Sequence, residues 1–200
     1  MRQFLAVSVL LAPALFVSCA DETPVIPPLS EPALVPLEVG DIWVYSAADP
    51  NDFGAFVDQV TEVREIGGRV YHRIEGDVLG SVLSKIGEGS GWIRFDHSRL
   101  LVLLSEQGAE KALFDLDQLP GEAWTIDGRR VLREENEIRI RVPFGFFDDI
   151  PNFIYDADSK GRWTILLKPG VGVVRATAGS SADSRVFEFR KGTVGGELVR

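Results

Sequence analysis

The chain has 200 residues, of which 45% are hydrophobic and 10% aromatic, which is enough to bury one ordinary core. Its net charge of -9 argues against nucleic acid as a partner, because an acidic surface repels phosphate. A single cysteine excludes an intramolecular disulfide, and with only two histidines the sequence has no cluster of zinc-binding spacing. We therefore expect no cofactor.

The first 18 residues have the pattern of a signal peptide. Arg2 gives a short positive start, and the apolar stretch 4–17 has the length of a signal-peptide core. It is too short for a comfortable membrane span, which needs about 20 residues. Residues 15–19 (LFVSC) then resemble a lipobox, although Phe16 departs from the usual leucine and predicts slower cleavage. We expect cleavage before Cys19, acylation of its thiol and stable anchoring in a lipid bilayer.

Two points about this amino-terminal region stay open. The segment could be an ordinary secretory signal that happens to be followed by the chain's only cysteine. Asp21 and Glu22 resemble the surface-export tags of some lipoproteins, but they also fit the start of a solvated linker. No aspartate directly follows Cys19, so the inner-membrane retention signal is missing. We expect an outer-membrane lipoprotein that faces the periplasm or the cell surface.

A proline-rich spacer follows the cysteine. Five prolines between residues 23 and 36 forbid a helix and favour an extended polyproline conformation; they are Pro24, Pro27, Pro28, Pro32 and Pro36. At about 3.1 Å per residue the spacer would hold a domain on the order of 40 Å from the lipid. A ligand for a proline-binding domain is the alternative. The predicted organisation is a signal peptide at 1–18, a lipidated linker at 19–36 and one β domain at 37–200.

From residue 37 the hydrophobic pattern has the period of two expected for strands. The predicted strands are 39–45, 56–66, 69–74, 92–95, 99–104, 111–116, 124–126, 130–133, 137–142, 153–155, 163–167, 171–176 and 186–190. Turn signals recur about every 8 to 12 residues, which is typical of antiparallel folds. We expect a mainly β fold, with an antiparallel sheet curved into a half-barrel, barrel or sandwich and few or no long helices.

Local signals refine this prediction. Gly67 and Gly68 predict a tight hairpin between the second and third strands. The segment 78–85 fits a short helix, a strand or a loop.

Each of the four tryptophans closely follows a glycine and starts an apolar run. Trp43 and Tyr45 are two residues apart in a predicted strand, so their side chains should share one face. An aromatic ligand platform is one interpretation, but we favour core packing at strand ends.

Several segments resemble a broad group of envelope lipoproteins. Residues 36–45 (PLEVGDIWVY) resemble the group's opening motif, and 113–124 resemble its mid-chain repeat. Residues 168–174 (KPGVGVV) resemble its late turn, and 143–147 (PFGFF) its G-x-F segment, although the aspartates at 148 and 149 and the lack of a following cysteine depart from it. The resemblance covers most of the β domain and implies a shape close to the curved half-barrels of lipoprotein carriers. It implies no activity.

The sequence carries few signals of catalysis or metal binding. It has no G-x-S-x-G elbow, and Ser180, Ser181 and Ser184 fit a polar loop. His72 fits a surface or rim position in a strand, and His97 after Asp96 fits a turn.

One acidic segment warrants a metal test. Asp156 and Asp158, followed by Gly161, have the spacing of a truncated calcium loop, but Lys160 replaces the next ligand and the distal glutamate is missing. An exposed turn is the preferred interpretation, with Asp156 and Asp158 as weak metal candidates.

We therefore expect a non-catalytic envelope lipoprotein. It would be anchored to the bilayer through Cys19 and bind a hydrophobic ligand, a glycan or an envelope protein. The alternative is a hydrolase of an envelope polymer that uses paired carboxylates. A purely structural role would be indicated by a closed core without a cavity.

Overall fold

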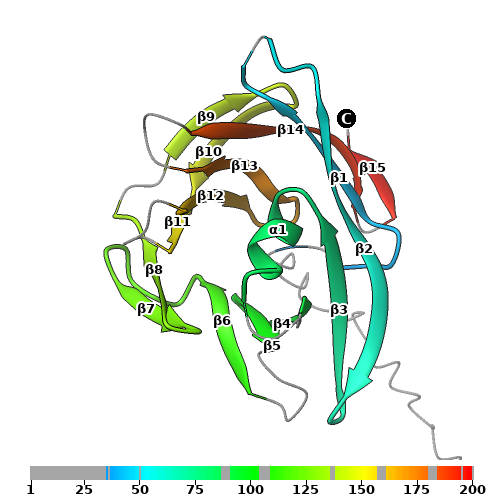
Figure 1. Ribbon diagram of the computed structural model, residues 1–200, viewed down its shortest axis with the longest axis vertical. Helices are drawn as coiled ribbons and strands as arrows, with labels where there is room; N and C mark the ends of the chain where they lie inside the picture. The colour runs from blue at the N-terminus through cyan, green and yellow to red at the C-terminus, as the bar shows by residue number, and fades with distance from the viewer. Residues whose placement is uncertain are drawn as a thin grey trace, which may run out of the picture. The chain divides into compact units, whose positions relative to one another are not determined.

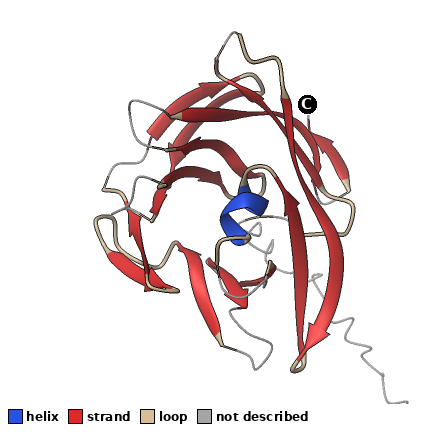
Figure 2. Cartoon of the chain, in the orientation of Figure 1, coloured by secondary structure: helices blue, strands red, loops and turns tan. Residues whose placement is uncertain are grey.

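The computed structural model describes residues 35, 37–49, 51–86, 91–103, 109–135, 138–156, 161–179, 184–194 and 196–199. All of them belong to one compact unit, Pro32–Arg200. The strands are β1 (Ile42–Ala47), β2 (Ala55–Ile66), β3 (Arg69–Gly76), β4 (Trp92–Asp96), β5 (Arg99–Leu103), β6 (Glu110–Asp115), β7 (Ala123–Ile126), β8 (Arg129–Arg133), β9 (Ile138–Val142), β10 (Gly145–Ile150), β11 (Asn152–Tyr155), β12 (Trp163–Lys168), β13 (Gly172–Ala178), β14 (Arg185–Val194) and β15 (Glu197–Val199). The helix is α1 (Leu79–Leu83). Figure 2 shows this helix among the strands.

The strands form one large antiparallel sheet and a separate hairpin. The order in the large sheet is β6-β5-β4-β3-β2-β1-β14-β13-β12-β11-β8-β7, and β15 adds to β14. Strands β9 and β10 make the second, two-stranded sheet. In Figure 1 the large sheet curves into a ring with α1 in its middle. The predicted mainly β fold with a curved antiparallel sheet is confirmed.

The sheet is nearly closed into a barrel at the edges of β6 and β7. Trp124 Nε1 of β7 donates a hydrogen bond to the Ala112 carbonyl of β6 at 2.8 Å. Arg133 Nη1 of β8 donates to the carbonyls of Leu116 and Gln118, each at 2.6 Å, and so holds the β6–β7 connection. Side chains therefore bridge the place where the strand order begins and ends.

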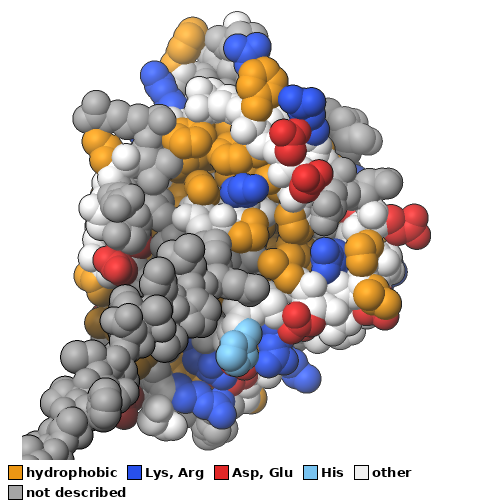
Figure 3. Space-filling model, turned by 180° about the vertical axis from the view of Figure 1, so that it is seen from behind, with side chains coloured by type: hydrophobic (Ala, Val, Ile, Leu, Met, Phe, Trp, Pro, Cys, Tyr) orange, Lys and Arg blue, Asp and Glu red, His pale blue; other side chains and the backbone are white. Residues whose placement is uncertain are grey.

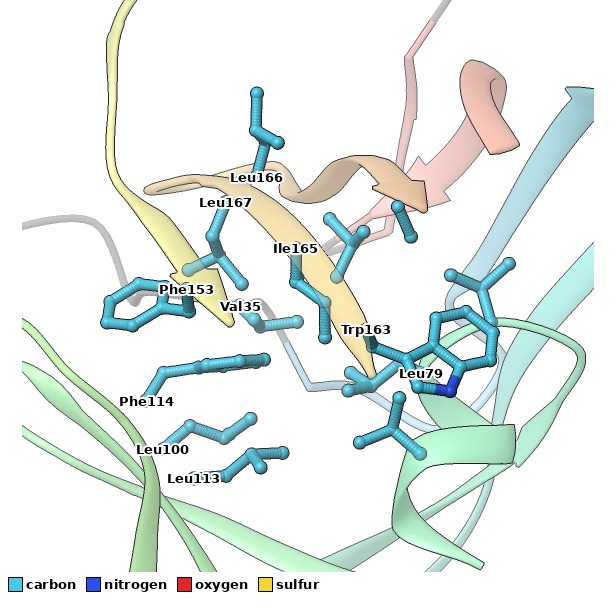
Figure 4. Close-up of a cluster of buried hydrophobic side chains, with 14 of the residues drawn as sticks. Val35, Leu79, Leu100, Leu113, Phe114, Phe153, Trp163, Ile165, Leu166 and Leu167 are labelled. Carbon is cyan, nitrogen blue, oxygen red and sulfur yellow. The ribbon is translucent and has the colours of Figure 1, made fainter. Parts of the chain in front are cut away.

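The interior is filled by apolar side chains that converge from several strands of the sheet. Phe114 of β6 and Phe153 of β11 meet with their ring centres 5.1 Å apart, and Figure 4 shows both within this cluster. Val35, which precedes the first strand, belongs to the same core and is 1% exposed (Figure 4). It lies inside the segment 19–36 that the sequence predicts as linker; the rest of that segment is outside the described residues.

Several local predictions are confirmed. Gly67 and Gly68 both have positive φ, of 58° and 76°, and join β2 to β3 in the expected tight turn. Trp43 and Tyr45 lie on one face and are both buried.

Strands β10 and β15 have no counterpart among the predicted strands. The ambiguous segment 78–85 contains the short helix α1 at Leu79–Leu83.

Candidate functional site

The most unusual buried group lies where α1 meets β2. Asp58 is fully buried and sits at an inward position of β2 between Phe56 and Val60, where the strand pattern calls for an apolar residue. An isolated buried carboxylate is costly unless hydrogen bonds compensate for its lost hydration. Its partners therefore explain why an acidic residue is tolerated here.

Three backbone N–H groups at the start of α1 supply that compensation. Val78 N donates to Asp58 Oδ1 at 3.1 Å, Leu79 N to Oδ2 at 2.7 Å and Gly80 N to Oδ1 at 3.2 Å. The residue before the helix, Val78, offers no capping side chain of its own. Asp58 thus caps a five-residue helix from a neighbouring strand, and it satisfies donors that such a short helix leaves unpaired.

Burial dominates the titration of this group. It raises the pKa of Asp58 to about 6, against the lowering effect of the N–H donors of Leu79, Val78 and Gly80, and the charge of Asp77 adds to the rise. Tyr45, which is also buried, has its pKa raised well above its ordinary value by burial, by the charge of Asp58 and by a hydrogen bond to it. Asp58 and Tyr45 are thus two interacting polar side chains within the apolar core.

A surface hollow lies on the other side of the same backbone. We call it the α1 pocket; it has a volume of about 350 Å³ and lies between β3 and α1. Its lining includes Arg73, Glu75, Gly76, Gly80, Ser81 and Ser84.

Two glycines separate the α1 pocket from Asp58. A Cβ on Gly76, whose φ is 151°, would lie 2.1 Å from the Val57 carbonyl oxygen and 2.4 Å from Asp58 Oδ1. A Cβ on Gly80 would lie 2.8 Å from the backbone carbonyl carbon of Glu75. Only glycine fits at these positions, so backbone alone divides the pocket from the buried carboxylate.

The histidines are placed as half-buried and exposed groups, not as parts of this pocket. His72 is half-buried, burial lowers its pKa, and its Nδ1 has no hydrogen-bond partner among the described residues. The His97 side chain is 93% exposed, in a turn. Its Nε2 lies 3.9 Å from Asp96 Oδ1, and Asp96 is bound more closely by Arg99, at 2.9 Å.

The candidate calcium loop is only partly described. Asp156 has a positive φ of 57°, and its Oδ2 accepts from Arg129 Nη1 at 2.7 Å. Asp158 lies outside the described residues, as do Cys19, Ser180 and Ser181, while Ser184 borders a different hollow. Among the described residues no group of three or more His, Cys, Asp or Glu side chains is arranged to hold a metal.

The tryptophans pack against the core, as expected. Trp43, Trp92 and Trp163 are buried, and the half-buried Trp124 packs its ring edge-on against Phe153. Trp43 Nε1 donates to the Val171 carbonyl at 2.6 Å, which ties β1 to the β12–β13 turn. These contacts give the aromatic side chains structural roles and leave no open aromatic platform at Trp43.

The sequence signal for the buried site was present but incomplete. An aspartate at the inward register of an alternating strand, between Phe56 and Val60, marks Asp58 as unusual. Its donors come from about 20 residues later, in a segment whose conformation the sequence left open. The serines of the pocket fall in that same segment, so their grouping could not be predicted.

Comparisons with known proteins give only distant similarity. No family model and no curated protein matches the chain. A solved structure from Bacteroides fragilis, of a protein with a YmcC-like fold that is named as exported, is 10% identical; 80% of this chain and 99% of that chain are covered, with a TM-score of 0.46. A Parabacteroides distasonis protein named as a lipoprotein is 13% identical over 82% of this chain and 100% of that chain, with a TM-score of 0.41. Similarity at this level carries no inference about the present chain.

Proposed function

We propose that this chain is an exported lipoprotein, held in the outer membrane by acylated Cys19, whose β domain binds a partner at its surface without catalysing a reaction. The anchor rests on the sequence: the apolar stretch ends in LFVSC, and this cysteine is the chain's only one. No helix within the described part of the chain is long and apolar enough to cross a bilayer. In this proposal the acyl chains on Cys19 supply the attachment to the bilayer.

The packing of the interior supports a surface role over an internal carrier role. The α1 segment inserts five apolar side chains into the core, each at most 3% exposed: Val78, Leu79, Val82, Leu83 and Ile86. At about 1.5–3 kcal/mol for each buried side chain, withdrawing α1 would cost on the order of 10 kcal/mol. That is comparable with the stability of a whole domain, about 5–15 kcal/mol. We therefore treat α1 as part of the core, not as a lid over a ligand chamber.

The outer surface offers two features that suit a partner. The α1 pocket is one, at about 350 Å³. The other is a group of apolar side chains on the face opposite to Figure 1. Figure 3 shows them near the middle of that face, with a Lys or Arg side chain among them and further charged side chains nearby. An apolar patch with a polar rim is typical of a contact surface. The α1 pocket, beside a buried carboxylate, is the observation that carries the binding proposal.

Hydrolysis by paired carboxylates gains no support at this pocket. Glu75 is bound by Arg73 Nε at 3.0 Å, and Asp58 is closed off behind Gly76 and Gly80. Two catalytic carboxyls would have to face each other across a cleft that admits the substrate. We therefore retain binding, with an envelope protein, a glycan or a lipid as the candidate partners.

Replacing Cys19 by serine tests the anchor. We expect the wild-type protein to label with radioactive palmitate and to sediment with outer membranes, and its mature mass to show an acylated amino-terminal cysteine. The C19S variant should lose the label and leave the membrane fraction. Palmitate labelling of C19S, or a mature wild-type protein that starts at another residue, would contradict the proposal. A Ser46→Ala variant, altered within β1, serves as a matched control and should behave like wild type.

A further inference from the structure

The serines that line the α1 pocket present acceptors, not donors. Ser81 Oγ donates its hydrogen bond to the Gly76 carbonyl at 3.4 Å, and Ser84 Oγ donates to the Ser81 carbonyl at 2.9 Å. A hydroxyl has one proton and two lone pairs. In this arrangement both protons are directed to carbonyls of the protein, and each serine offers its lone pairs to an incoming group.

Four of the nearby backbone donors are also committed. The N–H groups of Val78, Leu79 and Gly80 point to Asp58, behind the pocket, and Ser84 N donates to the Gly80 carbonyl at 2.9 Å. Free N–H groups at the start of a helix would favour an anion. Here they donate to a carboxylate that belongs to the protein itself, so the pocket gains no anion-binding character from them.

The charges around the pocket are mainly negative. The lining holds one carboxylate, on Glu75, and one guanidinium, on Arg73, and the buried carboxylate of Asp58 lies behind Gly76 and Gly80. Arg73 Nε lies 3.0 Å from Glu75 Oε1, so these two charges offset each other and the charge of Asp58 remains. The site where a Gly80 Cβ would stand is 3.5 Å from Asp58 Oδ1, so little material separates the pocket from the buried charge. A cation in the pocket would be attracted through this short distance.

We propose that the α1 pocket binds a primary ammonium group, carried by a small polar amine or by a lipid headgroup. This inference rests on the proposed binding function and names its ligand chemistry. An ammonium group has one positive charge and three N–H donors, which match the acceptors of Ser81, Ser84 and Glu75. The volume of about 350 Å³ suits an amino alcohol or an amino sugar.

Ligands that separate charge from hydrogen bonding test the proposal. The mature, lipidated protein in detergent would be titrated with ethanolamine, and the backbone amide signals of Gly76, Gly80 and Ser81 followed by NMR. We expect saturable shifts with ethanolamine and none with ethylene glycol, which has the same size but no charge. Equal shifts with both compounds, or no shift with either, would overturn the proposal.

Short-chain lipids distinguish the two sources of the ammonium group. Dihexanoyl phosphatidylethanolamine carries a primary ammonium, while dihexanoyl phosphatidylcholine carries the same charge without N–H donors. Tighter binding of the ethanolamine lipid than of free ethanolamine assigns the site to a lipid headgroup. Equal or weaker binding assigns it to a free amine. Equal binding of the two lipids contradicts ammonium recognition.

Variants of exposed lining residues test the acceptors. Glu75→Gln and Ser84→Ala should each weaken ethanolamine binding about 10-fold, because each removes one acceptor from a charge-assisted hydrogen bond. Both side chains are exposed, so the fold should be retained. Glu65→Gln, at an exposed position near the tip of the same hairpin, is the matched control and should bind as wild type does. If Glu75→Gln bound as well as this control, the ammonium site would be excluded, whereas the anchor would still be judged by lipidation of Cys19.

Discussion

Two acidic residues, Asp58 and Glu110, are held in the same molecule by opposite means. Asp58 lies inside the barrel and accepts from three backbone N–H groups. Glu110, at the start of β6, is 12% exposed; Arg94 binds it through Nε at 2.5 Å and Nη2 at 2.9 Å, Arg69 binds it at 2.6 Å, and the Tyr71 hydroxyl donates to it. Both carboxylates are fully hydrogen-bonded, yet their titration differs in direction.

The two pKa values shift in opposite directions because the hydrogen-bond donors differ in charge. The hydrogen bonds from Arg94 lower the pKa of Glu110, against a smaller rise from burial. Burial raises the pKa of Asp58, and its N–H partners, which carry only partial charge, do not reverse the effect. A buried carboxylate can therefore be well bonded and still be disfavoured as an anion. A full positive charge within contact distance decides the sign.

The largest effect is expected from Asp58→Ala. The substitution would leave three buried N–H groups without acceptors, at a cost of about 1–3 kcal/mol each, so we expect a loss of about 4 kcal/mol in the free energy of unfolding after relaxation. Urea unfolding followed by tryptophan fluorescence measures it. Asp77→Ala, an exposed neighbour, is the control and should cost about 1 kcal/mol or less. Equal losses would show that Asp58 does not hold α1.

The contribution of Asp58 to the free energy of unfolding should decrease as the pH rises. Its pKa is about 6 in the fold against an ordinary 3.8, so the folded state binds this proton more tightly than the unfolded state. The resulting stability, about 3 kcal/mol, is fully present below the ordinary pKa and is lost as the pH rises through about 6. Unfolding of wild type and Asp58→Asn from about pH 4 to about pH 7 isolates this contribution. A difference between the two proteins that does not change with pH would refute it.

Glu110→Gln should weaken the contacts that Arg94 and Arg69 make with this side chain. Glutamine keeps the shape but removes the charge that faces Arg94, whose side chain is 16% exposed, and Arg69. We expect a loss of about 2 kcal/mol, less than for a fully buried pair because solvent screens this one in part. The pKa of Tyr71, which is raised by burial and further by the hydrogen bond and charge of Glu110, should fall in the variant. Ultraviolet titration of tyrosine follows that change, and an unaltered titration would argue against the contact.

The smallest effect is expected from Arg94→Lys. Lysine keeps the positive charge but cannot form the two-point contact with Glu110, so the loss should be about 1 kcal/mol. The pKa of Glu110 should stay below its ordinary value, as measured by carboxyl carbon NMR. A return to the ordinary value would show that geometry, not charge, sets the direction.

The fold could be predicted from sequence because alternation and glycine turns act locally. Each long strand carries its own pattern, and Gly67 with Gly68 fixes the first hairpin. Strand β10 was missed because Asp148 and Asp149 interrupt its alternation at a bulge, where the register shifts between Phe147 and Ile150. The brevity of β15 offered no pattern at all.

The candidate site could not be predicted because its parts meet only in three dimensions. Helix α1 has five residues and lacks a capping side chain of its own, so its own sequence does not define it. Its stability comes from Asp58, which lies about 20 residues earlier in the chain. The inward position of Asp58 could be predicted from the strand pattern, but the backbone N–H groups that bind it could not.

The burial of Val35 has a mechanical consequence. Its side chain is 1% exposed in the barrel core, ahead of β1, and a Cβ on Gly172 would lie 3.3 Å from its Cγ1. Tension applied from the amino-terminal side must pull this side chain out of the core before it reaches the hydrogen bonds of β1. Val35, together with Leu37 and the hydrogen bond from Gly40 N to the Val60 carbonyl, is therefore one of the contacts that resist such tension before β1 itself is loaded.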